Sequence, residues 1–245
     1  MCESENCLLG GKVRLLQMQN GYRTAIDSIF LAAAVPAKAG ETVLDLGCGV
    51  GAVSFCLHAR IPGLTITGLD FQKPLIDLAR RNSMLNNCGD YIHFVHGDLL
   101  KAPKELSEAK YDHVMANPPY YKVRSVNKPP NIAKALAHVE GEAGLADWVG
   151  AACRALKPRG TVTFIHRADR VTDLIAALHK SFGGFVIFPL WTAQGKEAKR
   201  VIISARKGTS SPTKISSGLV LHKKNGIFSD QAQGVMKNAA ALRLS

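Results

Sequence analysis

The segment that most constrains the fold is a short apolar run leading into a turn built from glycines. Residues 43–46, Val-Leu-Asp-Leu, resemble a buried strand; Gly47, Gly49 and Gly51 follow, and then a helix-like stretch, 52–59. Glycine allows a tight turn and a close approach of the backbone to a ligand, so this unit predicts a ligand site at the end of a strand. The dinucleotide fingerprint is G-x-G-x-x-G, whereas the spacing here is D-x-G-x-G-x-G. This difference favours a ligand without a pyrophosphate.

Two further strand-like runs also end in acidic residues. The run 64–69 leads to Asp70, which lies 19 residues beyond Gly51, and the run 93–96 leads through a glycine to Asp98. A carboxylate at the end of the second strand of such a unit is placed to hold a ribose diol. The ordered acids therefore strengthen the prediction of a nucleoside-containing ligand.

A fourth apolar run, 111–116, ends in Asn117-Pro118-Pro119-Tyr120. An exocyclic amine is a poor nucleophile because its lone pair is delocalised into the ring. The Asn117 side-chain carbonyl and the Pro118 backbone carbonyl can accept both amine N–H groups and free that lone pair. The prolines fix the backbone around these acceptors, and Tyr120 offers a ring for stacking. This turn therefore suits the methylation of a planar amine.

The remaining sequence alternates between strand-like and helix-like segments, which predicts a parallel sheet with crossover helices. Glycine and proline at 157–160 and the pair Gly183-Gly184 indicate helix stops. Residues 208–218, rich in Ser, Thr, Gly and Pro, predict a linker to a short strand. The expected strands are 42–46, 65–69, 92–96, 111–116, 160–165, 185–190 and 200–205, and the expected helices are 24–35, 52–60, 73–86, 145–156 and 169–182.

Length and composition favour a single soluble domain. At 245 residues, with 47% hydrophobic and 20% charged residues, the chain fits one α/β domain. The six cysteines lack C-x-x-C spacing, and no metal site is expected. No 18-residue apolar span or signal peptide is evident, so we expect a cytoplasmic protein with reduced thiols and no membrane partner.

The charge is strongly basic. With 31 Lys and Arg against 19 Asp and Glu, the net charge is +12, which favours a polyanionic partner. Four basic residues and no acid lie in 122–134, directly after the Asn-Pro-Pro-Tyr turn. Eight basic residues and a single acid, Glu197, lie in 196–224, and we expect Lys199, Arg200, Lys223 and Lys224 to contact phosphates.

These motifs resemble those of class I S-adenosylmethionine-dependent methyltransferases that act on amines. More narrowly, the chain is similar to the bacterial tRNA(Val) adenine-37 N6-methyltransferase family. That match uses Asn20-Gly21-Tyr22-Arg23 with Asp27, the turn at 117–120, and two segments near the end, 221–226 and 228–230. The resemblance extends from about Gly21 to Val235 and implies a Rossmann-like, seven-stranded, mostly parallel sheet with helices on both faces. We expect one domain, 1–245, in which an extension, 1–40, contacts the cofactor site and 208–245 forms the linker, strand and tail.

The resemblance also implies roles for individual residues. Asp45 would lie near the ammonium of the S-adenosyl-L-methionine cofactor, Asp70 would hold its ribose, Phe71 would contact the adenine and Asp98 would bind the adenine amino group. Arg23 would pair with the cofactor carboxylate. The full expected cofactor site is Arg23, Asp45, Gly47, Gly49, Gly51, Asp70, Phe71, Asp98, Leu99 and Asn117; the expected catalytic residues are Asn117, Pro118, Pro119 and Tyr120; the expected substrate contacts are Tyr120, Tyr121, Lys122 and Arg124.

The target molecule is less narrowly defined than the reaction. Adenine N6 in tRNA is favoured by the basic charge and by the ease of splaying an unpaired base. A protein glutamine side chain presents a similar planar amine, but the enzymes that methylate it have a sizeable helical domain before the glycine turn, and only 44 residues precede Asp45. Guanine N2 of ribosomal RNA and a non-catalytic RNA-binding role are further alternatives. A monomer is the favoured oligomeric state.

Overall fold

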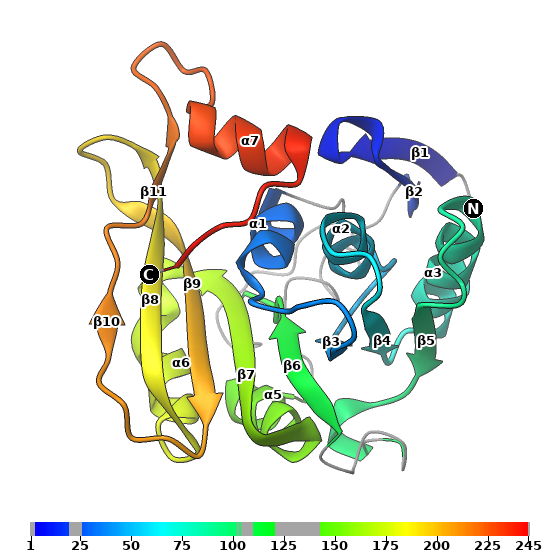
Figure 1. The fold of residues 1–245 in the computed structure, drawn as a ribbon, viewed down its shortest axis with the longest axis horizontal. Helices are drawn as coiled ribbons and strands as arrows, with labels where there is room; N and C mark the ends of the chain where they lie inside the picture. The colour runs from blue at the N-terminus through cyan, green and yellow to red at the C-terminus, as the bar shows by residue number, and fades with distance from the viewer. Residues whose placement is uncertain (1–2, 20–25, 102, 104–109, 121–142, 245) are drawn as a thin grey trace, which may run out of the picture.

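The centre of the molecule is a large, mostly parallel β-sheet (Figure 1). The computed structural model describes residues 3–19, 26–101, 103, 110–120 and 143–244. Within these residues the sheet has nine strands in the order β10-β8-β9-β7-β6-β3-β4-β5, and β11 also pairs with β8. The strands are β3 Thr42–Leu46, β4 Thr65–Asp70, β5 Ile92–His96, β6 Tyr111–Ala116, β7 Leu156–Arg167, β8 Phe182–Ala193, β9 Ala198–Lys207, β10 Lys214–Ile215 and β11 Leu219–His222.

Helices cover both faces of this sheet. One face carries α1 (Ile26–Ala34), α2 (Ala52–Arg60), α3 (Lys73–Leu85) and α7 (Asp230–Asn238), whose apolar residues share one core cluster. The other face carries α5 (Leu145–Ala155) and α6 (Val171–Leu178), which form a second cluster with the sheet. Burial of these two apolar layers is the main stabilising contribution to such a three-layer fold.

The strands predicted from the sequence are all present, including the short strand after the linker, which is β11, and β10 adds a further short strand within the predicted linker. β9, the seventh predicted strand, runs antiparallel to both β7 and β8. β10 and β11 extend the sheet beyond β8, because the segment after β9 returns to pair in parallel with the outer strand. The predicted helix stop at Gly183-Gly184 is wrong. α6 ends at Leu178 and both glycines lie within β8, where a Cβ on Gly183 would collide with the Thr209 carbonyl.

The N-terminal hairpin was not predicted from the sequence. β1 (Glu3–Leu8) and β2 (Val13–Met18) pair antiparallel and lie against α3. Asn82 of α3 joins the hairpin to the glycine turn: its amide accepts from Leu16 N at 2.8 Å and donates to Val50 O at 3.1 Å. The hairpin thus supports the turn through one buried side chain.

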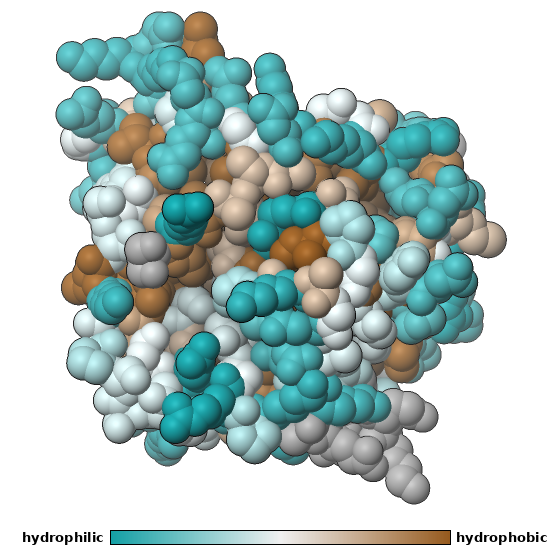
Figure 2. Space-filling view, in the orientation of Figure 1, coloured by the Kyte–Doolittle hydropathy of each residue, from teal (hydrophilic) through white to brown (hydrophobic). Residues whose placement is uncertain are grey.

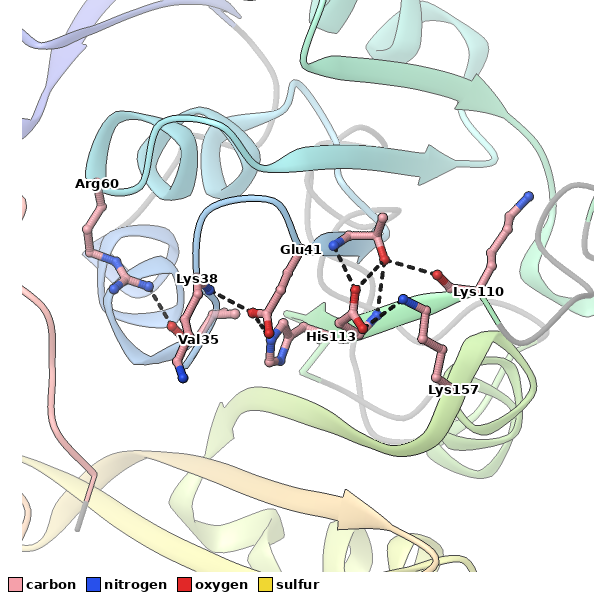
Figure 3. A network of polar contacts seen from close by, with 9 residues as sticks. Val35, Lys38, Glu41, Arg60, Lys110, His113 and Lys157 are labelled. Atoms are coloured by element: carbon pink, nitrogen blue, oxygen red, sulfur yellow. Dashed lines mark hydrogen bonds and ion pairs between the residues drawn. The ribbon is translucent and has the colours of Figure 1, made fainter.

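A network of hydrogen bonds and ion pairs links the amino ends of β3, β6 and β7 (Figure 3). His113 Nε2 lies 2.9 Å from Glu41 Oε2, and Lys157 Nζ lies 2.7 Å from Asp112 Oδ1. Asp112 also accepts from the backbone and hydroxyl of Thr42. Burial opposes ionisation of Asp112, but these donors prevail and lower its pKa to about 2. The network lies at the end of the sheet opposite to the site described below, and it serves the stability of the sheet.

Candidate active site

The sequence motifs meet at the carboxyl ends of the central strands. Leu46 pairs with Leu69 of β4 on one side and with Ala116 of β6 on the other. The glycine turn after β3, Asp70 at the end of β4 and Asn117 after β6 therefore lie next to one another. This edge of an open parallel sheet is where ligands bind in folds of this kind.

The three glycines of the turn have different surroundings. All three adopt left-handed φ angles, +68° at Gly47, +55° at Gly49 and +88° at Gly51. A Cβ on Gly47 would collide with the ring of Trp148, and one on Gly51 would collide with aromatic rings beneath the turn. At Gly49, among the described residues and apart from its two chain neighbours, no atom lies within 4 Å of the Cβ position. Gly47 and Gly51 thus admit core side chains, and Gly49 presents open backbone to a ligand.

Asp70 ties the turn to the neighbouring strand. Its Oδ2 accepts from Gly49 N at 2.9 Å and its Oδ1 accepts from Gln72 N at 2.8 Å. Burial raises the pKa of Asp70, while these two backbone donors oppose the rise. Each oxygen retains a lone pair, so the carboxylate can hold the turn and accept from a ribose diol at the same time.

Asp45 is buried beneath the turn, with 1% of its surface exposed. Ser54 Oγ of α2 donates to Asp45 Oδ2 at 2.7 Å. Burial raises the pKa of Asp45 to about 7; the Ser54 hydrogen bond opposes this rise and the nearby Asp70 adds to it. A carboxyl group in this setting gains strongly from a cationic partner.

The expected adenine contacts lie beyond the ends of β4 and β5. Phe71 is 57% exposed, which is unusual for a large apolar ring beside a buried carboxylate. Asp98 Oδ1 accepts from Leu100 N at 2.9 Å, and Leu99 begins a short 3₁₀ helix, Leu99–Lys101. The structure therefore brings Phe71, Asp98 and Leu99 to the side of the site next to Asp70.

The turn at residues 117–120, which the sequence predicts to be catalytic, is held by residues distant in sequence. The Tyr120 hydroxyl lies 2.5 Å from Asp27 Oδ2 and 2.9 Å from Asn117 Oδ1. Arg200 Nε donates to the same Asp27 oxygen at 2.9 Å, and the Arg200 guanidinium lies 4.4 Å from the centre of the Tyr120 ring. Tyr120 is only 7% exposed. Its ring is therefore part of a buried cluster, with the Arg200 guanidinium over it.

His166, at the end of β7, completes this cluster. Its ring meets the Tyr120 ring edge-on at 5.5 Å, and it is fully buried. Burial, together with the nearby positive charge of Arg170, lowers the pKa of His166 to about 4. The Arg167 backbone N–H donates to His166 Nδ1 at 2.9 Å, so the neutral ring carries its hydrogen on Nε2.

Sequence reasoning missed most of this cluster. Arg200 was expected to contact phosphates, and no observation tests that contact; its pairing with Asp27 was not expected, because the two residues are 173 positions apart in the sequence. His166 carried no signal beyond its place on a strand, and Asp27 was noted only through the family resemblance. Arg23, Tyr121, Lys122 and Arg124 lie outside the described residues.

Four exposed lysines lie in two segments, one next to Arg200 in the sequence and one directly after β11. Lys196 and Lys199 lie in and beside the turn between β8 and β9, and Lys223 and Lys224 follow β11. The two segments are neighbours because His222 pairs with Ala193. Lys223 is paired with Asp230 at 2.7 Å. Figure 2 shows hydrophilic side chains gathered at the upper left, where Figure 1 places the ends of β8 and β11. We call Lys196, Lys199, Lys223 and Lys224 the lysine rim.

Taken together, a glycine turn after β3, an acid at the end of β4 and an antiparallel seventh strand define a class I S-adenosylmethionine-dependent methyltransferase. The residues fit this cofactor, since Gly49 offers open space beside a buried carboxylate and an exposed aromatic ring. The family model for the methyltransferase small domain matches residues 23–187. The chain therefore belongs to the methyltransferase small domain family.

Known proteins agree with this assignment. A tRNA1(Val) (adenine(37)-N6)-methyltransferase of Aeromonas hydrophila is 28% identical over 216 residues, which is 85% of this chain and 86% of that protein. A release factor glutamine methyltransferase of Aliivibrio fischeri is 34% identical over 80 residues, which is 33% of this chain and 27% of that protein.

Among solved structures, that of a protein described as a predicted O-methyltransferase of Agrobacterium tumefaciens has a TM-score of 0.74 at 23% identity, covering 88% of this chain and 98% of that one. A geranyl diphosphate C-methyltransferase of Streptomyces coelicolor, solved with S-adenosyl-L-homocysteine, has a TM-score of 0.53 at 14% identity over 74% of this chain and 76% of that one. These likenesses confirm the fold, and the family uses S-adenosylmethionine as its cofactor.

Two other features bear on the site. No cluster of three or more potential metal ligands occurs among the residues that the structure describes. None of the helices in the described part of the chain combines the length and apolarity that a bilayer crossing requires.

Proposed function

We propose that this protein methylates N6 of an adenine in tRNA. The observation that carries the proposal is the placement of Asn117-Pro118-Pro119-Tyr120 directly beside the glycine turn, through the pairing of β6 with β3. A planar amine held at Asn117 would then lie next to the methyl donor, which is the alignment that a direct displacement needs.

The residues of the chain supply binding and orientation. S-adenosylmethionine supplies a methyl group on a sulfonium, so the new N–C bond forms as the C–S bond breaks. Gly49 and Asp70 would hold the ribose part of the cofactor, and Asp45 would face its ammonium. The Asn117 side-chain carbonyl and the Pro118 carbonyl would accept the amine N–H groups. The methylated nitrogen is cationic and acidic, so water can take its proton and no dedicated base is required.

Three observations support RNA as the substrate. The net charge of +12 favours a polyanion, and the lysine rim lies beside β9, whose Arg200 contacts the catalytic Tyr120. The Aeromonas hydrophila relative, which matches over most of both chains, is named for adenine methylation of tRNA. A tRNA substrate places the protein in the cytoplasm.

A transfer assay with two competing substrates tests the proposal. Bulk unmodified tRNA and a peptide containing Gly-Gly-Gln are incubated with the protein and radiolabelled cofactor at several salt concentrations. The proposal predicts label in the tRNA, with transfer that weakens as salt rises. Transfer to the peptide with none to tRNA would replace adenine by a protein glutamine as the target.

A further inference from the structure

The Tyr120 hydroxyl has two neighbours that both present oxygen. Asp27 Oδ2 lies 2.5 Å away and Asn117 Oδ1 lies 2.9 Å away, yet a hydroxyl has only one hydrogen to donate. The hydroxyl can donate this hydrogen to only one of the two oxygens. The lone pairs of the other oxygen would then face the lone pairs of the hydroxyl oxygen, which is unfavourable. The conflict is buried, because Tyr120 is 7% exposed and Asp27 is 4% exposed.

The hydrogen goes to Asp27. A hydrogen bond to a carboxylate is shorter and roughly twice as strong as one to a neutral carbonyl, and the distance to Asp27 is the shorter of the two. Arg200 Nε also donates to Asp27 Oδ2 at 2.9 Å, so that oxygen serves as an acceptor for both groups. The carboxylate is thus the acceptor of the hydroxyl hydrogen, and the Tyr120 oxygen, which also accepts from the Arg200 side chain, faces Asn117 without a hydrogen to donate.

This arrangement determines which way the Asn117 amide faces. Rotating the amide by 180° about χ2 exchanges Oδ1 and Nδ2, so Nδ2 then lies beside the Tyr120 oxygen and donates to it. The carbonyl Oδ1 is turned away from Tyr120. We propose that Asp27, acting through the Tyr120 hydroxyl, orients the Asn117 amide so that its carbonyl faces the amine to be methylated. This inference rests on the proposed amine methylation.

The alternative orientation is unproductive. An Asn117 with its NH₂ toward the substrate would present two donors to an amine whose own hydrogens need acceptors. The amine would lose one of its two acceptors, and its lone pair would stay delocalised. Asp27 and Arg200 are therefore positioning residues: they act on the reaction only through Tyr120 and Asn117, and they do not touch the substrate.

The test is a double-mutant cycle with Asp27→Asn and Tyr120→Phe. Tyr120→Phe keeps the ring and removes only the hydroxyl, so it is expected to fold, and its kcat should fall by about tenfold, the value of one hydrogen bond of about 1.4 kcal/mol. Asp27→Asn should lower kcat by a similar factor. The double variant should be no slower than Tyr120→Phe alone, because Asp27 acts through the hydroxyl. The KM for tRNA and the cofactor dissociation constant should each stay within about twofold.

A matched control separates positioning from stability. His113→Gln breaks the buried His113–Glu41 contact at the opposite end of β6, so it should lower the thermal midpoint and leave kcat unchanged. The inference would be overturned if the reduction of kcat in the double variant equalled the product of the two single reductions, or if Tyr120→Phe left kcat unchanged. Either result would leave the proposed function intact. If the unmodified protein transfers no methyl group to tRNA, the proposed function fails instead.

Discussion

The backbone N–H of Gly49 donates to Oδ2 of Asp70 at 2.9 Å, and this bond joins the turn after β3 to the end of β4. The same carboxylate thus holds the turn, and in the proposed cofactor site it would also accept from the ribose. Its loss would disturb the cofactor site in two ways, since the turn would lose an anchor and the ribose would lose an acceptor.

Asp70→Ala should weaken S-adenosylmethionine binding by about 1–3 kcal/mol, roughly 5- to 150-fold. The variant loses a charged acceptor for the ribose and the bond to Gly49. Titration calorimetry measures the dissociation constant, and Asp77→Ala, an exposed acid on α3, is the control. An unchanged affinity in Asp70→Ala would refute the role given to this carboxylate.

Asn117→Ala should lower kcat by about 10²- to 10⁴-fold and leave cofactor affinity largely intact, because the amide acts on the substrate amine. Single-turnover transfer to tRNA measures the chemical step, and calorimetry measures the cofactor. Retention of more than about a tenth of the activity would contradict the function assigned to the turn.

Asp45→Asn should stabilise the cofactor-free protein at pH 8 more than at pH 5. The pKa of Asp45 is raised from 3.8 to about 7. The protonated native form therefore contributes stability that is fully present below pH 3.8 and is lost as pH rises through 7. The amide side chain of the variant carries no charge at any pH, so the variant does not lose this stability. At pH 8 the thermal midpoint of the variant should therefore exceed that of the unmodified protein by about 4 °C or more. If the thermal midpoints of the variant and of the unmodified protein differ by the same amount at every pH in this range, the ionisation of Asp45 does not cause the loss of stability.

Neutralising part of the lysine rim should weaken tRNA binding without slowing the chemical step. Lys196, Lys199 and Lys224 are exposed, whereas Lys223 is already paired with Asp230. Changing these three to Gln should flatten the dependence of log K on log salt by about two to three units, since each phosphate contact contributes roughly 0.7–0.9. Filter binding over a salt series measures the slope.

The matched control for the rim changes Lys38, Lys180 and Lys214 to Gln, which removes the same charge from exposed positions outside the rim. An equal flattening in both triple variants would mean that the total charge, and not the rim, governs binding. A slope that neither triple variant changes would exclude both explanations.

The central strands and their turns could be predicted from sequence because their signals are local. Residues 43–51 combine a buried strand run with glycines at fixed spacing, and the structure gives β3, the turn and α2 within one residue of the predicted limits. The residues that contact a motif in space could not be predicted from sequence in the same way. Nothing near Arg200 indicates that it contacts Asp27, because the pairing of β9 with β7 alone brings it to that place.

The sequence signals of the short peripheral strands, β1 and β10, are weaker than those of the central strands. β1 alternates exposed and half-buried residues and contains Glu3 and Glu5, so its sequence lacks the apolar face that marks a strand. It is stabilised by the antiparallel pairing with β2 and by contacts of the hairpin with α3, including the ion pair of Glu3 with Arg81. β10 has two residues, which is too short for any periodic pattern.

Nucleoside analysis of the product tests the central claim most directly. tRNA from a strain that lacks the gene for this protein is digested to nucleosides before and after treatment with the protein and S-adenosylmethionine, and the nucleosides are separated by mass spectrometry. The account predicts a gain of N6-methyladenosine that is absent when Asn117→Ala replaces the unmodified protein. A gain of a methylated guanosine, or of no methylated nucleoside, would contradict it.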